Sequence, residues 1–118
     1  MWLRPPSGST TLNRKLGKEW LEVGRTNSLS PIGVAVDLKQ YKYIRLILFS
    51  NQFNAEDSRQ EIISISEIDI DIFSKILGIR TEYIGDVKYN AFAKYIDDNT
   101  VNIYISGSTN AHCRLYVR

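Results

Sequence analysis

The chain contains one cysteine, one histidine and three prolines in 118 residues. The single Cys113 excludes a disulfide within the chain and a zinc site built from several cysteines. A lone thiol fits synthesis in a reducing compartment. No run approaches the roughly 20 apolar residues of a membrane-spanning helix, so no membrane insertion is expected. The opening residues also lack the apolar core of a signal peptide.

Neither sign of charge predominates: the chain has 15 Lys and Arg and 13 Asp and Glu, which gives a formal net charge of +2. The basic residues are scattered and form no stripe, so nucleic acid is not an expected partner. The glycines do not gather into a phosphate-binding loop, and Gly78, Gly85 and Gly107 are predicted to be turn residues. No motif indicates a reaction, so we predict a protein that is not an enzyme and has no catalytic residue, metal or cofactor.

Short alternating segments separated by turn signals are what the sequence does contain. Hydrophobic residues make up 43% and charged residues 24%, as in an ordinary globular domain. The run "YKYIRLILFS" at 41–50 is apolar on both faces and predicts a central strand. An all-β fold follows, an antiparallel β-sandwich or jelly roll of about seven to nine short strands with at most one short helix. Residues 1–17 are predicted to be a linker or flexible N-terminal arm, 18–118 the sandwich domain, and 51–59 an exposed loop.

One segment breaks the alternation. In "EIISISEIDIDIF" the isoleucines change from odd to even positions, at Ile63, Ile65, Ile68, Ile70 and Ile72. A single strand would therefore turn its apolar face over near Ser66–Glu67, which predicts a bulge, a turn or an exit from the sheet there. A short helix within 68–77 is the alternative.

The acidic residues offer two candidate sites. Glu67, Asp69 and Asp71 would share one face of an extended strand and present hard oxygen ligands to a cation. No loop of further oxygen ligands accompanies them, so a solvated strand face is the preferred interpretation. Asp97 and Asp98 are two carboxylates, as a glycosidase requires, but adjacent side chains on a turn point apart and cannot flank one bond. The sequence Asp-Asp-Asn is predicted to be a turn.

The stretch from Thr100 to Arg118 forms two alternating arms around Ser106–Asn110 and is predicted to be the last hairpin. Cys113 shares its parity with Ala111, Leu115 and Val117 and is predicted to lie in the core. His112 lies on the opposite face, so the two cannot form a nucleophilic pair. We expect that opposite face to be exposed or to form an interface. The candidate ligand-binding or interface residues are Tyr104, Asn110, His112, Arg114 and Tyr116.

Tyrosine supports this choice because its flat ring stacks on a sugar while its hydroxyl forms hydrogen bonds. Seven of the residues are tyrosines.

Three stretches, "EWLEVGRT", "VDLKQYKYIRLIL" and "DNTVNIYISGSTNAHCRLYVR", resemble the small β-sandwich or jelly-roll domains at the C-terminal end of bacteriophage tail fibres, tail spikes and receptor-binding proteins. The resemblance spans about Glu19 to Arg118 and transfers no site residues. It implies a virion tail protein that is made in the host cytoplasm and forms a homotrimer. It also implies host attachment by binding a saccharide or protein of the bacterial surface, with other virion tail proteins as partners.

Two alternative functions stay open at this point. One is a virion assembly or structural protein that binds only other phage proteins. The other is the accessory carbohydrate-binding module of a polysaccharide-degrading enzyme.

Overall fold

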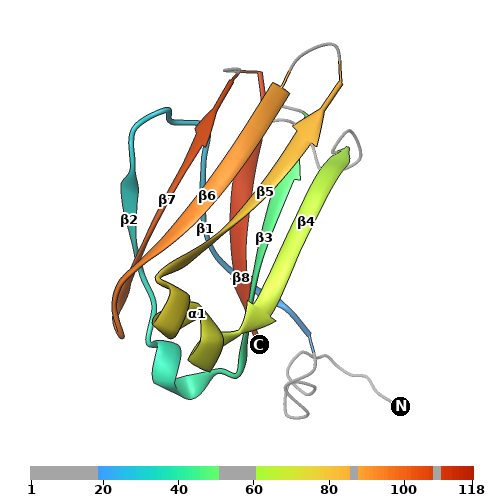
Figure 1. Cartoon of the computed structure of the whole chain (residues 1–118). Coiled ribbons are helices and arrows are strands. Elements are labelled where there is room, and N and C mark those ends of the chain that lie inside the picture. Colours follow the sequence, from blue (N-terminus) through green and yellow to red (C-terminus); the bar gives the residue numbers. More distant parts are fainter. Residues whose placement is uncertain (1–18, 51–60, 86–87, 108–109) are drawn as a thin grey trace, which may run out of the picture.

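Two antiparallel four-stranded sheets face each other in the computed structural model (Figure 1). The structure describes residues 19–50, 61–85, 88–107 and 110–118, so the expected arm at 1–17 and the expected loop at 51–59 lie outside the described residues. The prediction of an all-β sandwich is confirmed. Within the described residues no helix is long and apolar enough to cross a membrane.

Each sheet mixes strands from distant parts of the sequence. Sheet A has the order β1 (Leu21–Thr26), β8 (His112–Val117), β3 (Tyr43–Phe49) and β4 (Ile62–Asp69). Sheet B has the order β2 (Ile32–Ala35), β7 (Thr100–Ser106), β6 (Lys88–Asp97) and β5 (Gly78–Ile84). The helices are the 3₁₀ turn η1 (Leu38–Gln40) and α1 (Ile70–Ile76).

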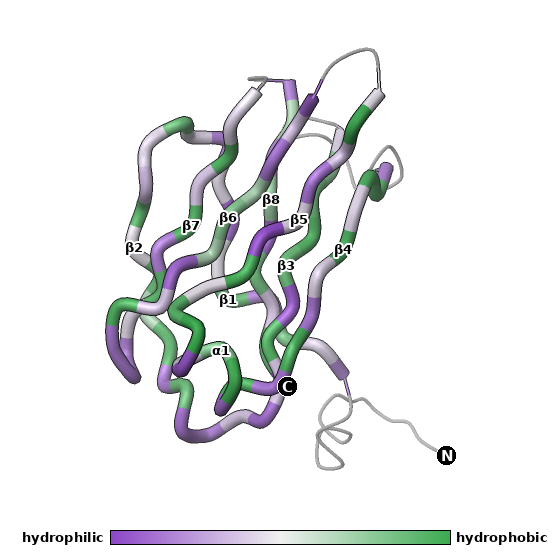
Figure 2. Tube along the Cα trace, viewed as in Figure 1, coloured by the Kyte–Doolittle hydropathy of each residue, from purple (hydrophilic) through white to green (hydrophobic). Residues whose placement is uncertain are grey.

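The core lies between the sheets and is built from the alternating apolar residues. Hydropathy alternates along β7, whereas β3 is hydrophobic over most of its length (Figure 2). The residues predicted to point inward from the last two arms are all buried: Val101, Ile103, Ile105, Ala111, Cys113, Leu115 and Val117. In β3 the residues Ile47 and Phe49 face away from this core and are nevertheless buried, which accounts for a strand that is apolar on both faces.

The switch in isoleucine parity has a different cause from the one expected. Strand β4 pairs residue by residue with β3 from Ser64 to Asp69, and the irregularity lies between Ile62 and Ser64. Ile65 lies opposite Ile47 on the outer face of sheet A. The expected bulge at Ser66–Glu67 is therefore wrong, because the edge strand places serines at its inner positions.

The helical alternative is correct for the residues that follow. Helix α1 packs one face against the core through Ile70 and the fully buried Phe73. It ends at Leu77, which adopts a left-handed φ of 71° and donates its N–H to the carbonyl of Phe73 at 2.9 Å. The helix lies between the two sheets at one end of the sandwich (Figure 1).

The last two strands do not form the expected hairpin. Strand β7 pairs with β2 and β6 in sheet B, whereas β8 lies between β1 and β3 in sheet A. Both arms point their apolar residues into the same core, but they do so from opposite layers. Alternation reports which face of a strand is buried and does not identify its neighbour, so the sequence pattern suits either arrangement.

Candidate functional site

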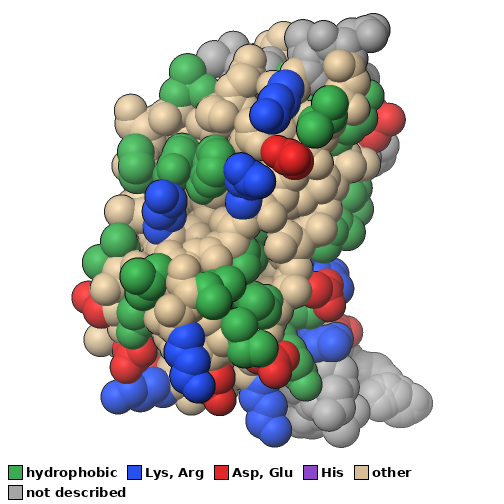
Figure 3. All heavy atoms as spheres, viewed as in Figure 1, with side chains coloured by type: hydrophobic (Ala, Val, Ile, Leu, Met, Phe, Trp, Pro, Cys, Tyr) green, Lys and Arg blue, Asp and Glu red, His purple; other side chains and the backbone are tan. Residues whose placement is uncertain are grey.

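The outer face of sheet B carries an aromatic pair. Phe92 on β6 lies directly opposite Tyr104 on β7, and their rings stack with centroids 4.7 Å apart and planes 17° apart. Both point outward because their neighbours in sequence, such as Ala93 and Ile103, fill the core. Arg80 of β5 lies opposite Phe92 on its other side. Figure 3 shows a row of hydrophobic side chains across β7 and β6, with Lys and Arg side chains beside it.

The neighbouring row of cross-strand partners in the same sheet has a glycine at each end. It consists of Gly78, Lys94, Asn102 and Gly33, which lie opposite one another from β5 to β2. The two glycines have no side chain, and a Cβ on Gly78 would lie only 2.7 Å from the carbonyl oxygen of Ala93. The aromatic pair therefore lies beside a row of residues whose two end positions carry no side chain.

A groove of about 620 Å³ lies at the Gly78 end of this row, next to helix α1. Phe92 and Lys94 line it together with three apolar residues, Ile76, Leu77 and Ile96. These three are 56%, 59% and 51% exposed. Ile76 and Leu77 lie at the C-terminal end of helix α1, and Ile96 lies on the outward face near the end of β6. Exposed isoleucine and leucine side chains around an aromatic ring are typical of a binding surface.

Positive charge predominates on this face. The outward positions of β5 and β6 hold Arg80, Lys88 and Lys94 against one carboxylate, Glu82. None of the salt bridges within the described residues involves Arg80 or Lys94. We define the sheet B groove as this hollow together with the two adjoining side chains on β7, Asn102 and Tyr104. Its residues are Ile76, Leu77, Gly78, Arg80, Phe92, Lys94, Ile96, Asn102 and Tyr104.

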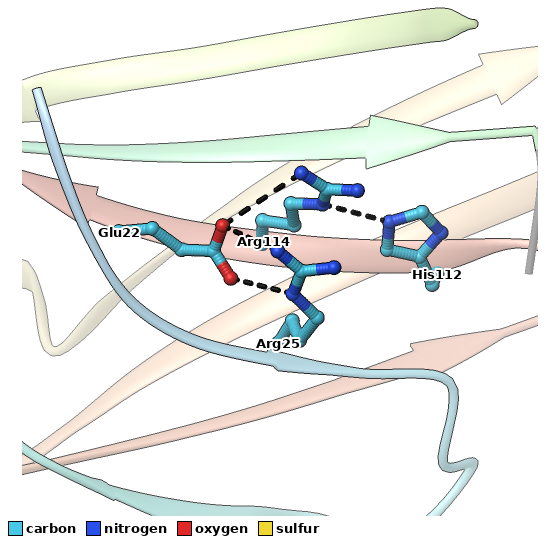
Figure 4. Close-up of polar contacts among 4 residues, drawn as sticks. All are labelled: Glu22, Arg25, His112 and Arg114. Carbon is cyan, nitrogen blue, oxygen red and sulfur yellow. Dashed lines mark hydrogen bonds and ion pairs between the residues drawn. The ribbon is translucent and has the colours of Figure 1, made fainter. Parts of the chain in front are cut away.

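A polar cluster occupies the outer face of sheet A (Figure 4). Nε and Nη2 of Arg25 donate to the two carboxylate oxygens of Glu22, at 2.5 and 2.7 Å, and Nη1 of Arg114 lies 3.7 Å from Oε1 of the same carboxylate. Arg114 donates from Nε to Nε2 of His112 at 3.0 Å. Glu22 and Arg25 are three residues apart but share one face because the register shifts between Glu22 and Gly24.

Two members of this cluster, His112 and Arg114, are buried, contrary to expectation. His112 is fully buried and Arg114 is 7% exposed, so the predicted exposed face of β8 is wrong for these two residues. The ring of Phe49 stacks on His112 with centroids 4.9 Å apart, and the Arg114 guanidinium lies 4.7 Å from the Phe49 centroid. On the outer face of sheet A, the ring of Phe49 thus covers two side chains that alternation alone predicts to be exposed to solvent.

The five predicted site residues do not come together. Tyr104 is on sheet B, whereas His112, Arg114 and Tyr116 are on sheet A, and Asn110 is exposed in the segment between the two strands. Tyr116 is half-buried, and burial raises the pKa of its hydroxyl. Of the five, only Tyr104 belongs to the sheet B groove.

Sequence reasoning missed Phe92, the second ring of the pair. A signal was present, because in "KYNAFAKYI" Phe92 alternates with Ala91 and Ala93 and shares its parity with the polar Asn90 and Lys94. An aromatic residue on the polar side of a strand indicates an exposed or ligand-facing ring. The aromatic candidates chosen from the sequence were tyrosines only, and Phe92 was therefore not among them.

The acidic candidates have structural partners. Glu67 forms a salt bridge with Arg45 at 2.8 Å, and Asp71 leaves the strand face because α1 begins at Ile70. The described residues contain no group of three or more potential metal ligands from His, Cys, Asp and Glu.

The second acidic pair forms the predicted turn. Asp97 accepts the N–H of Asn99 at 2.8 Å, and Asp98 accepts the hydroxyl of Tyr95 at 2.8 Å. The turn at Asp97–Asn99 is therefore confirmed, with each carboxylate engaged in holding it.

Cys113 lies in the core as predicted, and its side chain points away from that of His112. Burial raises the pKa of its thiol to about 12. Such a thiol is protonated at neutral pH and is a poor nucleophile.

Comparisons with known proteins give no relatives. No protein-family model, no curated protein and no solved structure matches this chain.

Proposed function

We propose that the domain is a non-catalytic binding module that holds a saccharide in the sheet B groove. The observation that carries this proposal is the stacked pair Phe92–Tyr104 on an outer sheet face, with Phe92 lining the groove. The pair forms a continuous apolar wall against which the C–H face of a sugar packs. Asn102 and the Tyr104 hydroxyl lie where they can bind sugar hydroxyls.

The wider biological role is proposed from sequence resemblance. We propose that the module is part of a phage tail and attaches the virion to host saccharide, working as a homotrimer. The three stretches that resemble tail-fibre and tail-spike domains support this role. Light scattering that gives a mass near three chains, together with adsorption to bacterial cells, would support it; a monomer that adsorbs to no cells would contradict it.

Saccharide binding is tested by a glycan array of bacterial surface polysaccharides with purified wild-type protein and two variants, Phe92→Ala and Tyr104→Ala. Each variant should bind about tenfold more weakly, because each removes half of the aromatic wall. The matched control is Tyr43→Ala, which removes a 41% exposed tyrosine from sheet A and should leave binding unchanged. Circular dichroism checks that all variants are folded.

Two results would overturn the proposal. One is the absence of binding to any saccharide of the array. The other is binding that persists at wild-type strength in both Phe92→Ala and Tyr104→Ala.

A further inference from the structure

The charges around the sheet B groove carry information about the ligand. We infer that the groove selects acidic saccharides, in which a carboxylate, as in a uronate or a sialate, meets Arg80 and Lys94. This inference rests on the proposed saccharide-binding function and adds the chemical class of the sugar.

Two cations flank the aromatic wall in different directions. Arg80 lies directly across the strand pair from Phe92, and Lys94 follows Phe92 by two residues on the same face of β6. Both side chains are exposed. A sugar packed against Phe92 is therefore within reach of a guanidinium, which binds a carboxylate through two N–H groups, and of an ammonium.

No salt bridge within the described residues includes either of these two cations. Arg80 and Lys94 line the groove, and its other lining residues are uncharged. The one outward carboxylate of β5 and β6, Glu82, lies opposite Asn90, two residues from Arg80 on the same face of β5, and forms no salt bridge with it. An anionic ligand is the complement that such a surface favours.

Sheet A shows the contrast. There Arg25 and Arg114 share Glu22, and Arg45 is paired with Glu67. These three arginines of sheet A are thus balanced by strand carboxylates, whereas Arg80 and Lys94 of the groove take part in no salt bridge within the described residues. The groove therefore combines two cations that form no salt bridge with a half-buried, stacked aromatic pair.

The experiment compares acidic polysaccharides with their own carboxyl-reduced forms on one array. Polygalacturonate, alginate, hyaluronan and polysialic acid are the acidic probes, and dextran sulfate serves as a polyanion without carboxylates. The variants are Arg80→Gln and Lys94→Gln. Lys88→Gln is the matched control, because Lys88 lies on the same face of β6 but does not line the groove.

We expect wild-type protein to bind at least one acidic probe and to bind its reduced form about tenfold more weakly or not at all. Arg80→Gln and Lys94→Gln should each weaken the acidic probe about tenfold, with the difference shrinking as salt rises. Lys88→Gln should bind like wild type. Phe92→Ala should weaken the acidic and the reduced form of a probe alike.

The outcomes separate this inference from the proposed function. Equal binding to acidic and reduced forms, lost in Phe92→Ala, would overturn acidic selectivity and leave saccharide binding intact. Binding to dextran sulfate that matches the best acidic probe and survives Phe92→Ala would show general polyanion attraction and overturn the inference. No binding to any array member would overturn both.

Discussion

Arg114 donates a hydrogen bond from Nε to Nε2 of His112 at 3.0 Å, so Nε2 acts as the acceptor and carries no proton. Two side chains that look like a functional pair in sequence thus form part of the packed outer layer of sheet A. Their partners are Phe49, which stacks on the imidazole, and Glu22, which pairs with the guanidinium.

Replacing Arg114 with alanine should destabilise the fold by about 2–4 kcal/mol, because it leaves the buried acceptor of His112 without this donor and opens space beside Phe49. Arg25→Ala is the matched control, since Arg25 binds the same carboxylate but its side chain is one-third exposed. Its cost should be about 1 kcal/mol or less. Urea denaturation measures both, and equal costs would contradict the assignment of Arg114 to the packed layer.

The stability of the domain should fall between about pH 9 and pH 12 in a way that depends on Cys113. Its thiol has a pKa of about 12 in the folded chain, because burial raises it from the ordinary value of 9.0. The unfolded chain therefore loses the proton first as pH rises, and unfolding becomes easier. The contribution is complete below pH 9 and should shrink by roughly 2–3 kcal/mol by pH 11.

The measurement is urea denaturation of wild type and Cys113→Ala from pH 7 to pH 11. Tyrosines and lysines titrate in both proteins, so only the difference between the two curves reports on the thiol. A difference that stays constant across this range would refute the prediction.

Gly107→Ala should be strongly destabilising. Gly107 has a left-handed φ of 105°, and a Cβ there would lie 2.1 Å from the carbonyl oxygen of Lys88. Backbone strain and the clash together should cost about 2–4 kcal/mol. Gly33→Ala is the control, because the nearest atom to its added Cβ would be 3.6 Å away. Thermal unfolding should show a large loss for the first variant and little change for the second.

Ser64 and Thr81 should be energetically coupled across the sandwich. Their hydroxyls form a hydrogen bond that joins β4 at the edge of sheet A to β5 at the edge of sheet B. A double-mutant cycle with Ser64→Ala and Thr81→Val should give a coupling of about 1 kcal/mol. Purely additive effects would mean that the two edges do not depend on this bond.

Hydrophobic alternation predicted much of the fold. The class, the inward residues of β7 and β8, the turn at Asp97–Asn99 and the core position of Cys113 all follow from local chemistry. Alternation carries no information about which strands pair, because that depends on contacts between distant segments. The expected hairpin of β7 and β8 failed for this reason, and with it the expected single surface containing both Tyr104 and His112.

The candidate site was predicted only in part. Tyr104 was named from its residue type, but its stacking partner Phe92 and the flanking Arg80 are brought to it by sheet register, which alternation leaves undetermined. The burial of His112 was equally beyond the local pattern. Phe49, more than 60 positions earlier in the chain, covers the imidazole with its ring.

The position of β8 has a consequence for the order of assembly. Sheet A places this strand between β1 and β3, so β1 has no other partner in that sheet. Synthesis must pass residues 112–117 before β1 can be held there, whereas β5, β6 and β7 follow one another and can pair as they emerge. Folding should therefore begin with the β5–β6–β7 meander of sheet B and finish with sheet A. The final step should be slow, because pairing β1 with β8 joins segments that are far apart in the sequence.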